Sequence, residues 1–220
     1  MTEFRPVRAI IFDIDGTLTP EVSWTSLTAG LGASADEHLR IFNNFLDGSI
    51  DYPESKRQLL GLWQSTGKAN QTFISELFAA WPLKPEAPAV IAELQKDYQL
   101  CLITGSMDLY AATIARKVGV QEWHANTELI WNGQGNLVDY AYQKDQAGQK
   151  LTDFEAFCAA HGISPDECVA VGDSKNDLAL FAACGRGVLL AEAEPSPELA
   201  PHAWKTIHSL TELPSLLLKG

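Results

Sequence analysis

The sequence predicts an α/β protein in which a doubly wound parallel sheet carries a helical segment inserted after its first strand. Residues 9–12 form a short, unbroken apolar run, which suits a strand buried on both faces of a parallel sheet. After residue 82 similar runs alternate with segments of helical periodicity, which is typical of a parallel, Rossmann-like sheet. We therefore predict a core at residues 1–19 and 83–220 and an α-helical cap domain at residues 20–82.

The inserted segment is expected to contain four helices between Ser23 and Trp81, separated by short polar breaks. The breaks fall at residues 30–34, 47–53 and 65–69. Three polar residues near these breaks are candidate helix caps: Ser34, Asp51 and Asn70. Large aromatic side chains recur along the segment, and we expect them to form the core of the cap rather than a box around a substrate: Trp24, Phe42, Phe45 and Trp63.

The rest of the chain is expected to alternate between strands and helices. The predicted strands are Gln99–Ile103, Cys168–Val171, Gly187–Leu190 and Trp204–Ile207, and the predicted helices are Glu86–Asp97, Met107–Val118, Gln149–His161, Asp177–Ala183 and a terminal helix from Thr211. A β-hairpin is predicted from Glu128–Trp131 and Leu137–Tyr142. The Asn132-Gly133 pair between these strands supplies the turn conformations that a hairpin needs.

Composition and charge limit the classes of molecule that the protein is expected to bind. The net charge of −12 repels polyanions, and no local basic patch offsets it, so we expect neither a nucleic-acid nor a membrane partner. No apolar stretch approaches the roughly 18 residues of a membrane span. The N-terminus lacks a secretory apolar run and the four cysteines lie singly, so we expect a cytoplasmic protein with reduced cysteines.

Polar signatures follow three of the predicted strands. They are Asp13-Ile14-Asp15-Gly16-Thr17, Thr104-Gly105-Ser106 and Gly172-Asp173-Ser174-Lys175-Asn176-Asp177. Strands of one parallel sheet end on the same side, so these side chains should converge. Two like charges 4 Å apart repel by roughly 4 kcal/mol at an effective dielectric near 20, so four aspartates in one cleft call for a cation. Oxygen ligands without Cys or His favour Mg²⁺.

These residues predict phosphoryl chemistry. Asp13 can attack a phosphate as nucleophile once a cation relieves the charge repulsion. Asp15, two residues later, can protonate the leaving oxygen and then deprotonate a water molecule. Thr104 offers a hydroxyl donor, and the amides of Gly105 and Ser106 are expected to open a helix whose N-terminus favours an anion. Lys150 can supply a fixed positive charge.

With these motifs in place the chain resembles the haloacid dehalogenase superfamily, and within it the phosphoserine phosphatase-like branch with a helical, C1-type cap. DIDGT matches the first motif, Thr104 the second, Lys150 the third and GDSKND the fourth. The resemblance implies Asp13 as nucleophile, Asp15 as acid and base, and a phosphate site with Thr104, Gly105, Lys150 and Asn176. It implies Mg²⁺ bound by the Asp13 side chain, the Asp15 backbone carbonyl and Asp173, with Asp177 acting through water or behind these ligands.

The cap departs from the pattern of that branch. Its substrate-carboxylate arginine aligns with Leu59, two residues away from Arg57 and on a different side of the predicted helix. Glu21 lies slightly closer to the nucleophile than the cap glutamate of the branch, and Ser106 replaces the second glycine of a pair. Glu21, Ser106 and Arg57 are the possible substrate contacts, and these departures argue against phosphoserine itself.

The sequence therefore predicts a Mg²⁺-dependent phosphomonoester hydrolase that acts on a small phosphorylated metabolite through an aspartyl-phosphate intermediate. Two alternatives stay open: a phosphotransferase or mutase of the same superfamily, and a non-catalytic phosphate-binding regulatory protein. The sequence is equally compatible with a monomer and a homodimer.

Overall fold

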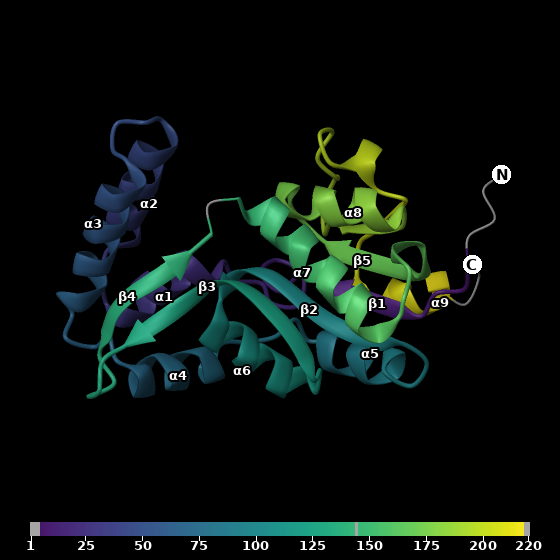
Figure 1. The fold of residues 1–220 in the computed structure, drawn as a ribbon, viewed down its shortest axis with the longest axis horizontal. Coiled ribbons are helices and arrows are strands. Elements are labelled where there is room, and N and C mark those ends of the chain that lie inside the picture. Colours follow the sequence, from purple (N-terminus) through teal and green to yellow (C-terminus); the bar gives the residue numbers. More distant parts are fainter. Residues whose placement is uncertain (1–4, 144, 218–220) are drawn as a thin grey trace.

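The computed structural model describes residues 5–143 and 145–217 and is built around one seven-stranded sheet (Figure 1). The predicted core also includes residues 1–4, 144 and 218–220, which lie outside the described residues. The strand order is β4-β3-β2-β1-β5-β6-β7. The strands are β1 (Ala9–Phe12), β2 (Gln99–Met107), β3 (Glu122–Trp131), β4 (Leu137–Tyr142), β5 (Cys168–Gly172), β6 (Gly187–Leu190) and β7 (Lys205–Ile207).

Strand β1 lies in the middle of the sheet and is buried on both faces, as predicted. It pairs in parallel with β2 on one side and with β5 on the other, and Ile11 aligns with Cys101 and Ala170. Ile10 and Phe12 belong to a core with the helices α5 (Ala87–Leu94), α6 (Asp108–Val118) and α9 (Leu213–Leu217). Ala9 and Ile11 face a second core with α7 (Gln146–His161) and α8 (Leu178–Cys184). Helices on both faces confirm the predicted doubly wound α/β class.

Four helices form between β1 and α5, as predicted: α1 (Ser23–Leu31), α2 (Ala35–Leu46), α3 (Tyr52–Gln64) and α4 (Gln71–Ala80). The side chains of Ser34, Asp51 and Asn70 accept hydrogen bonds from amides in the first turns of α2, α3 and α4, so all three act as N-caps. The two ends of the segment meet, because the Lys84 amide donates to the Leu18 carbonyl at 2.9 Å.

The β3–β4 hairpin is longer than predicted. Residues 122–127 of β3 run parallel to β2, and the later part of the strand pairs antiparallel with β4. In Figure 1 this hairpin leaves the rest of the sheet and reaches the inserted helices. Lys56 on α3 pairs with Asp139 on β4 at 2.7 Å, and the Gln71 amide donates to the Gly135 carbonyl at 2.8 Å.

Other elements lie where the sequence predicts them, and their ends differ from the prediction by a few residues. The four cysteines are buried and free, as expected. Helix α7 begins at Gln146 rather than Gln149, because Asp145 accepts a hydrogen bond from the Gly148 amide and caps the helix. In the described part of the chain, no helix combines the length and apolar character that crossing a membrane requires.

Candidate active site

Asp13 and Asp15 follow the C-terminal end of β1, on either side of the buried Ile14. Asp13 is only 5% exposed, and its amide continues the sheet by donating to the Val171 carbonyl at 2.9 Å. Gly16 then turns the chain with a φ of +74°. A Cβ atom on Gly16 would lie 2.3 Å from Oδ2 of Asp173, so glycine lets the β1 loop approach the end of β5 closely.

Lys150 connects the first and fourth motifs. Its Nζ donates to Oδ1 of Asp13 at 2.8 Å and to Oδ1 of Asp177 at 2.7 Å, and the side chain is almost fully buried. Burial raises the pKa of Asp13 to about 8 against the opposing effect of Lys150. Burial lowers the pKa of Lys150, but its two carboxylate neighbours outweigh it and hold that pKa above the ordinary value. The lysine therefore stays charged and fixes Asp13.

Three carboxylates gather where a metal ion could be held. Oxygen atoms of Asp13, Asp173 and Asp177 lie within 4.8 Å of one another. Burial, together with the charge of Asp177, raises the pKa of Asp173 to about 6, and Oδ1 of this residue accepts from the Thr17 hydroxyl at 3.1 Å. This all-oxygen, charge-rich group fits a hard divalent cation such as Mg²⁺.

Asp177 differs from the other two acids because both of its oxygens already have partners. Oδ1 accepts from Lys150, and Oδ2 accepts from the amides of Asp173 and Ser174, each at 3.1 Å. Its side chain is completely buried and does not line the cavity described below. Asp177 therefore suits a position behind Asp13 and Asp173. Of these three acids, Asp13 and Asp173 are the two that line the cavity.

Asp15 is oriented by Ser23, the first residue of α1. The Ser23 hydroxyl and amide donate to Oδ2 of Asp15 at 2.6 and 3.0 Å, and the Ser106 hydroxyl lies in close hydrogen-bonding contact with that of Ser23. Oδ1 of Asp15 is buried, and the Tyr110 hydroxyl interacts with this carboxyl group and helps to lower its pKa. Burial raises the pKa of Asp15 to about 6, while the bonds from Ser23 oppose the rise.

The end of β2 contributes polar groups to the site. Gly105 and Ser106, however, do not form the N-terminus of a helix. Strand β2 continues to Met107, and α6 begins at Asp108. The Ser106 amide donates to the Thr104 hydroxyl at 3.2 Å. The prediction that these two amides open the helix is therefore wrong, because the chain stays extended for longer than the Thr-Gly-Ser sequence indicated.

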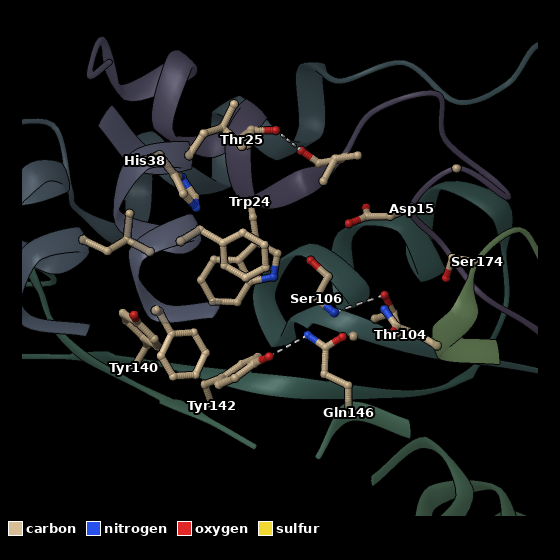
Figure 2. A pocket seen from close by; sticks show the side chains of 18 of the residues that line it. Asp15, Trp24, Thr25, His38, Thr104, Ser106, Tyr140, Tyr142, Gln146 and Ser174 are labelled. Atoms are coloured by element: carbon tan, nitrogen blue, oxygen red, sulfur yellow. Dashed lines mark hydrogen bonds between the residues drawn. The ribbon is translucent and has the colours of Figure 1, made fainter. Parts of the chain in front are cut away.

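A cavity of about 390 Å³ brings most of the predicted residues together (Figure 2). Its lining includes the following predicted residues: Asp13, Asp15, Thr104, Gly105, Ser106, Lys150, Asp173 and Asn176. Figure 2 shows Asp15, Thr104 and Ser174 on one side of the cavity and His38, Tyr140 and Tyr142 on the other.

Two predicted substrate contacts lie elsewhere. Glu21 accepts from the Ser26 hydroxyl at 3.0 Å and is not part of the lining. Arg57 pairs with Glu54 at 2.6 Å, and its side chain is 72% exposed. Ser55 and Leu59 of α3 do line the cavity, and Arg57, two residues from each, lies on another face of the helix.

Sequence reasoning missed one side of the cavity. Trp24, Phe42 and Phe45 line it, whereas they were expected in a cap core, and only Trp63 is fully buried as expected. The sequence also gave no role to Tyr140 and Tyr142. Their i, i+2 spacing on a strand puts both side chains on one face. This shared face could have been predicted from the sequence before the position of the hairpin was known.

Comparisons with known proteins agree with this geometry. A family model described as haloacid dehalogenase-like hydrolase matches residues 7–185. A phosphoserine phosphatase from Albidiferax ferrireducens is 27% identical over 199 residues, which cover 88% of this chain and 82% of the relative. One from Streptomyces coelicolor is 26% identical over 205 residues, which cover 90% of this chain but only 47% of the relative, so the chain spans about half of that protein.

Two solved structures share the fold over nearly their whole length. A phospho-aspartyl intermediate analogue of phosphoserine phosphatase superposes with a TM-score of 0.73 at 23% identity, covering 96% of this chain and 99% of the other. A substrate-bound phosphoserine phosphatase complex gives 0.74 at 22% identity with the same coverage. The family match spans most of the chain, and the resemblance drawn from the motifs is confirmed: the chain belongs to the haloacid dehalogenase-like hydrolases.

Proposed function

We propose that the protein is a Mg²⁺-dependent phosphatase that hydrolyses a small phosphorylated metabolite through an aspartyl-phosphate intermediate. One observation carries the proposal: a buried aspartate fixed by a lysine shares a cavity with a second aspartate that Ser23 orients. The family is one of hydrolases, and the relatives named above are phosphoserine phosphatases.

The first half of the proposed reaction uses Asp13 and Asp15. Lys150 holds Oδ1 of Asp13, so Oδ2 is the oxygen that attacks phosphorus. The bond between phosphorus and the leaving oxygen breaks, and Asp15 donates a proton to that oxygen, which departs as an alcohol. Ser23 bonds Oδ2 of Asp15 and fixes the orientation of this carboxyl group beside Asp13 in the cavity.

The second half releases the phosphoryl group. Asp15, now ionised, takes a proton from water, the resulting hydroxide attacks phosphorus, and the acyl phosphate bond breaks to give inorganic phosphate and free Asp13. Thr104, Lys150 and Asn176 are proposed to bind the phosphoryl oxygens, together with Gly105. Mg²⁺, held by Asp13, Asp173 and the Asp15 backbone carbonyl with Asp177 behind them, would supply positive charge against the phosphoryl oxygens.

We further propose that residues 20–82 form a cap domain, that the protein is cytoplasmic and that it is a monomer or a homodimer. The contact between Leu18 and Lys84, at the two ends of the inserted helices, supports a boundary between a core and a cap near residues 19 and 83. Four free, buried cysteines are compatible with a reducing cytoplasm. A monomer and a homodimer are equally compatible with the cavity, whose described lining comes from this chain.

Hydrolysis of p-nitrophenyl phosphate tests the mechanism. We expect turnover with Mg²⁺, loss of activity in EDTA and loss of at least about a hundredfold in Asp13→Asn, which lacks the nucleophile. A similar loss is expected in Asp15→Asn, which lacks the base of the second step, since general acid-base groups contribute roughly 10² to 10⁴ in rate. Asp36→Asn, an exposed acid of α2, is the matched control and should keep full activity. Full activity in Asp13→Asn would refute the mechanism.

Two further measurements address the alternatives. Phosphate release without an added acceptor distinguishes a hydrolase from a phosphotransferase or mutase. Beryllofluoride with Mg²⁺ should raise the melting temperature of the wild type, because a ligand that binds only the folded state stabilises it. No stabilisation and no turnover would favour a non-catalytic phosphate-binding protein.

A further inference from the structure

The side of the cavity away from the aspartates is formed by aromatic and aliphatic side chains. They come from the start of α1, from α2 and α3, and from β4: Val22, Trp24, Leu39, Ile41, Phe42, Phe45, Tyr52, Leu59, Tyr140 and Tyr142. Trp24 packs edge-on against Tyr140 and Tyr142, with ring centroids 5.7 and 5.9 Å apart. The walls are therefore rigid aromatic faces supplied by two separate parts of the chain.

This apolar side carries no charged side chain among the described residues that line it. The charged residues of the lining are Asp13, Asp15, Asp173 and Lys150, all at the catalytic end. Lys150 is already bonded to two carboxylates. His38 is the titratable imidazole of this wall, and burial lowers its pKa to about 4, which keeps it neutral at neutral pH.

Part of the apolar wall is in contact with solvent. Leu39 and Phe42, one helical turn apart on α2, are each 45% exposed, and Val22 is 57% exposed. Covering such atoms with an apolar group removes them from water and is favourable in proportion to the area covered. A charged group placed there would instead lose water without gaining a partner of opposite charge.

We propose that the leaving group of the substrate is an uncharged, largely apolar alcohol, so that the substrate is an alkyl or similarly apolar phosphomonoester. This inference rests on the proposed phosphatase function and adds the class of substrate. The catalytic end takes the phosphate, and the wall of Trp24, Phe42 and Tyr142 takes the hydrocarbon part. An amino-acid leaving group such as serine would bring an ammonium and a carboxylate to a wall whose described polar side chains, Thr25, Ser55 and Gln146 among them, carry no charge.

A series of primary alkyl phosphates tests the inference. Ethyl, n-butyl and n-hexyl phosphate have leaving groups of nearly equal basicity, so kcat/KM reports binding of the chain rather than chemical reactivity. We expect kcat/KM to rise about fourfold for each methylene that the cavity covers. A flat or falling series would overturn the inference.

A second comparison tests the effect of charge on the leaving group. Isobutyl phosphate carries methyl groups where O-phospho-L-serine carries an ammonium and a carboxylate. We expect kcat/KM to favour isobutyl phosphate by at least about tenfold, because unpaired charges are costly to desolvate. A preference for O-phospho-L-serine would contradict the proposal directly.

Two leucines of α2 form a matched pair of variants. Leu39 lines the cavity, whereas Leu46 is 64% exposed and does not. Leu39→Ala should lower the ratio of kcat/KM for n-hexyl phosphate to that for ethyl phosphate by about fivefold to tenfold, and Leu46→Ala should leave this ratio unchanged. Equal losses on both esters in Leu39→Ala would count against the inference.

Binding of non-hydrolysable phosphonates separates this inference from the proposed function. Calorimetry on the wild-type protein with Mg²⁺ should show n-hexylphosphonate binding more tightly than methylphosphonate. That result without turnover of any ester would refute the phosphatase and retain the apolar site. Turnover of all esters with no effect of chain length, in kcat/KM or in binding, would retain the phosphatase and refute the apolar site.

Discussion

At the scale of single residues, His38 is a buried imidazole among the inserted helices. It is 5% exposed, its Nδ1 lies 2.6 Å from the Thr28 hydroxyl, and its ring packs edge-on against Trp63. The Thr28 hydroxyl also accepts from Nε1 of Trp63 at 2.7 Å. The imidazole is thus part of a buried polar chain that joins α1, α2 and α3.

The buried His38 predicts loss of stability in mild acid. Burial lowers the pKa of His38 from 6.5 to about 4, so between these values the unfolded chain binds a proton that the folded protein excludes. Its contribution is complete above pH 6.5 and is lost as the pH falls toward 4. Chemical denaturation from pH 7.5 to 4 should therefore show a steeper decline for wild type than for His38→Gln, by no more than about 1.4 kcal/mol per pH unit. Identical pH profiles would refute the assignment.

The sequence predicted the residues at the strand ends far better than those of the cap. Asp13, Thr104 and Asp173 could be placed because parallel strands bring their carboxyl ends together whatever the details of packing. The position of Lys150 could be predicted only with the help of the family resemblance, because the helical pattern around it does not indicate that its side chain points into the site. Arg57 could not be placed, because the direction of its side chain depends on how α3 is rotated against the hairpin. Glu21 precedes α1 and instead bonds locally to Ser26.

At the scale of elements, the β3–β4 turn departs from its prediction in an instructive way. Asn132-Gly133 was expected to provide the special turn conformation, but the glycine with a positive φ is Gly135, at +78°. Oδ1 of Asn132 accepts from the amides of Gln134 and Asn136 at 2.9 and 3.0 Å. The Asn132 amide also donates to the Asn136 carbonyl, which closes a three-residue loop that ends in a left-handed glycine.

This turn provides a matched pair of glycines. Neither Gly133 nor Gly135 would bring a Cβ within 4 Å of another group, so the backbone conformation is what differs between them. Gly135→Ala should lower the free energy of unfolding by about 1–2 kcal/mol, because alanine is strained at positive φ. Gly133→Ala should leave it unchanged or raise it slightly. Equal effects in urea denaturation would contradict the assignment of the turn.

The first half of β3 could not be predicted from its own residues. Glu122 to Asn126 reads as a polar stretch with one tryptophan, and it becomes a strand because β2 offers it parallel partners from Cys101 to Thr104. The full length of β3 then carries β4 outward to the inserted helices. Tyr140 and Tyr142 reach the cavity only through that long-range pairing, which local patterns do not report.

At the scale of the whole molecule, divalent metal binding should be coupled to folding. The proposed ligands follow β1 and β5, two strands that only the folded sheet brings together, so Mg²⁺ should bind the folded state almost exclusively. At a hundred times its Kd, Mg²⁺ should raise the free energy of unfolding by about 2.7 kcal/mol.

Thermal and urea unfolding with Mg²⁺ and with EDTA measure this coupling. Asp173→Asn should reduce or abolish the stabilisation, whereas Asp36→Asn, which changes the net charge equally on an exposed helix face, should retain it. Equal stabilisation of the wild type and both variants would indicate general charge screening and would argue against the proposed ligands.

The bond between Ser23 and Asp15 also matters for redesign. Ser23 is the first residue of α1, and its neighbours Val22 and Trp24 belong to the apolar wall. Reshaping the wall at these two neighbours is expected to move the Asp15 carboxylate as well, so selectivity and the proposed proton transfer should change together. Leu39 and Phe42 of α2 line the same cavity with apolar side chains that cannot hydrogen-bond to either aspartate, so α2 is the place to change the proposed selectivity while leaving the proposed chemistry alone.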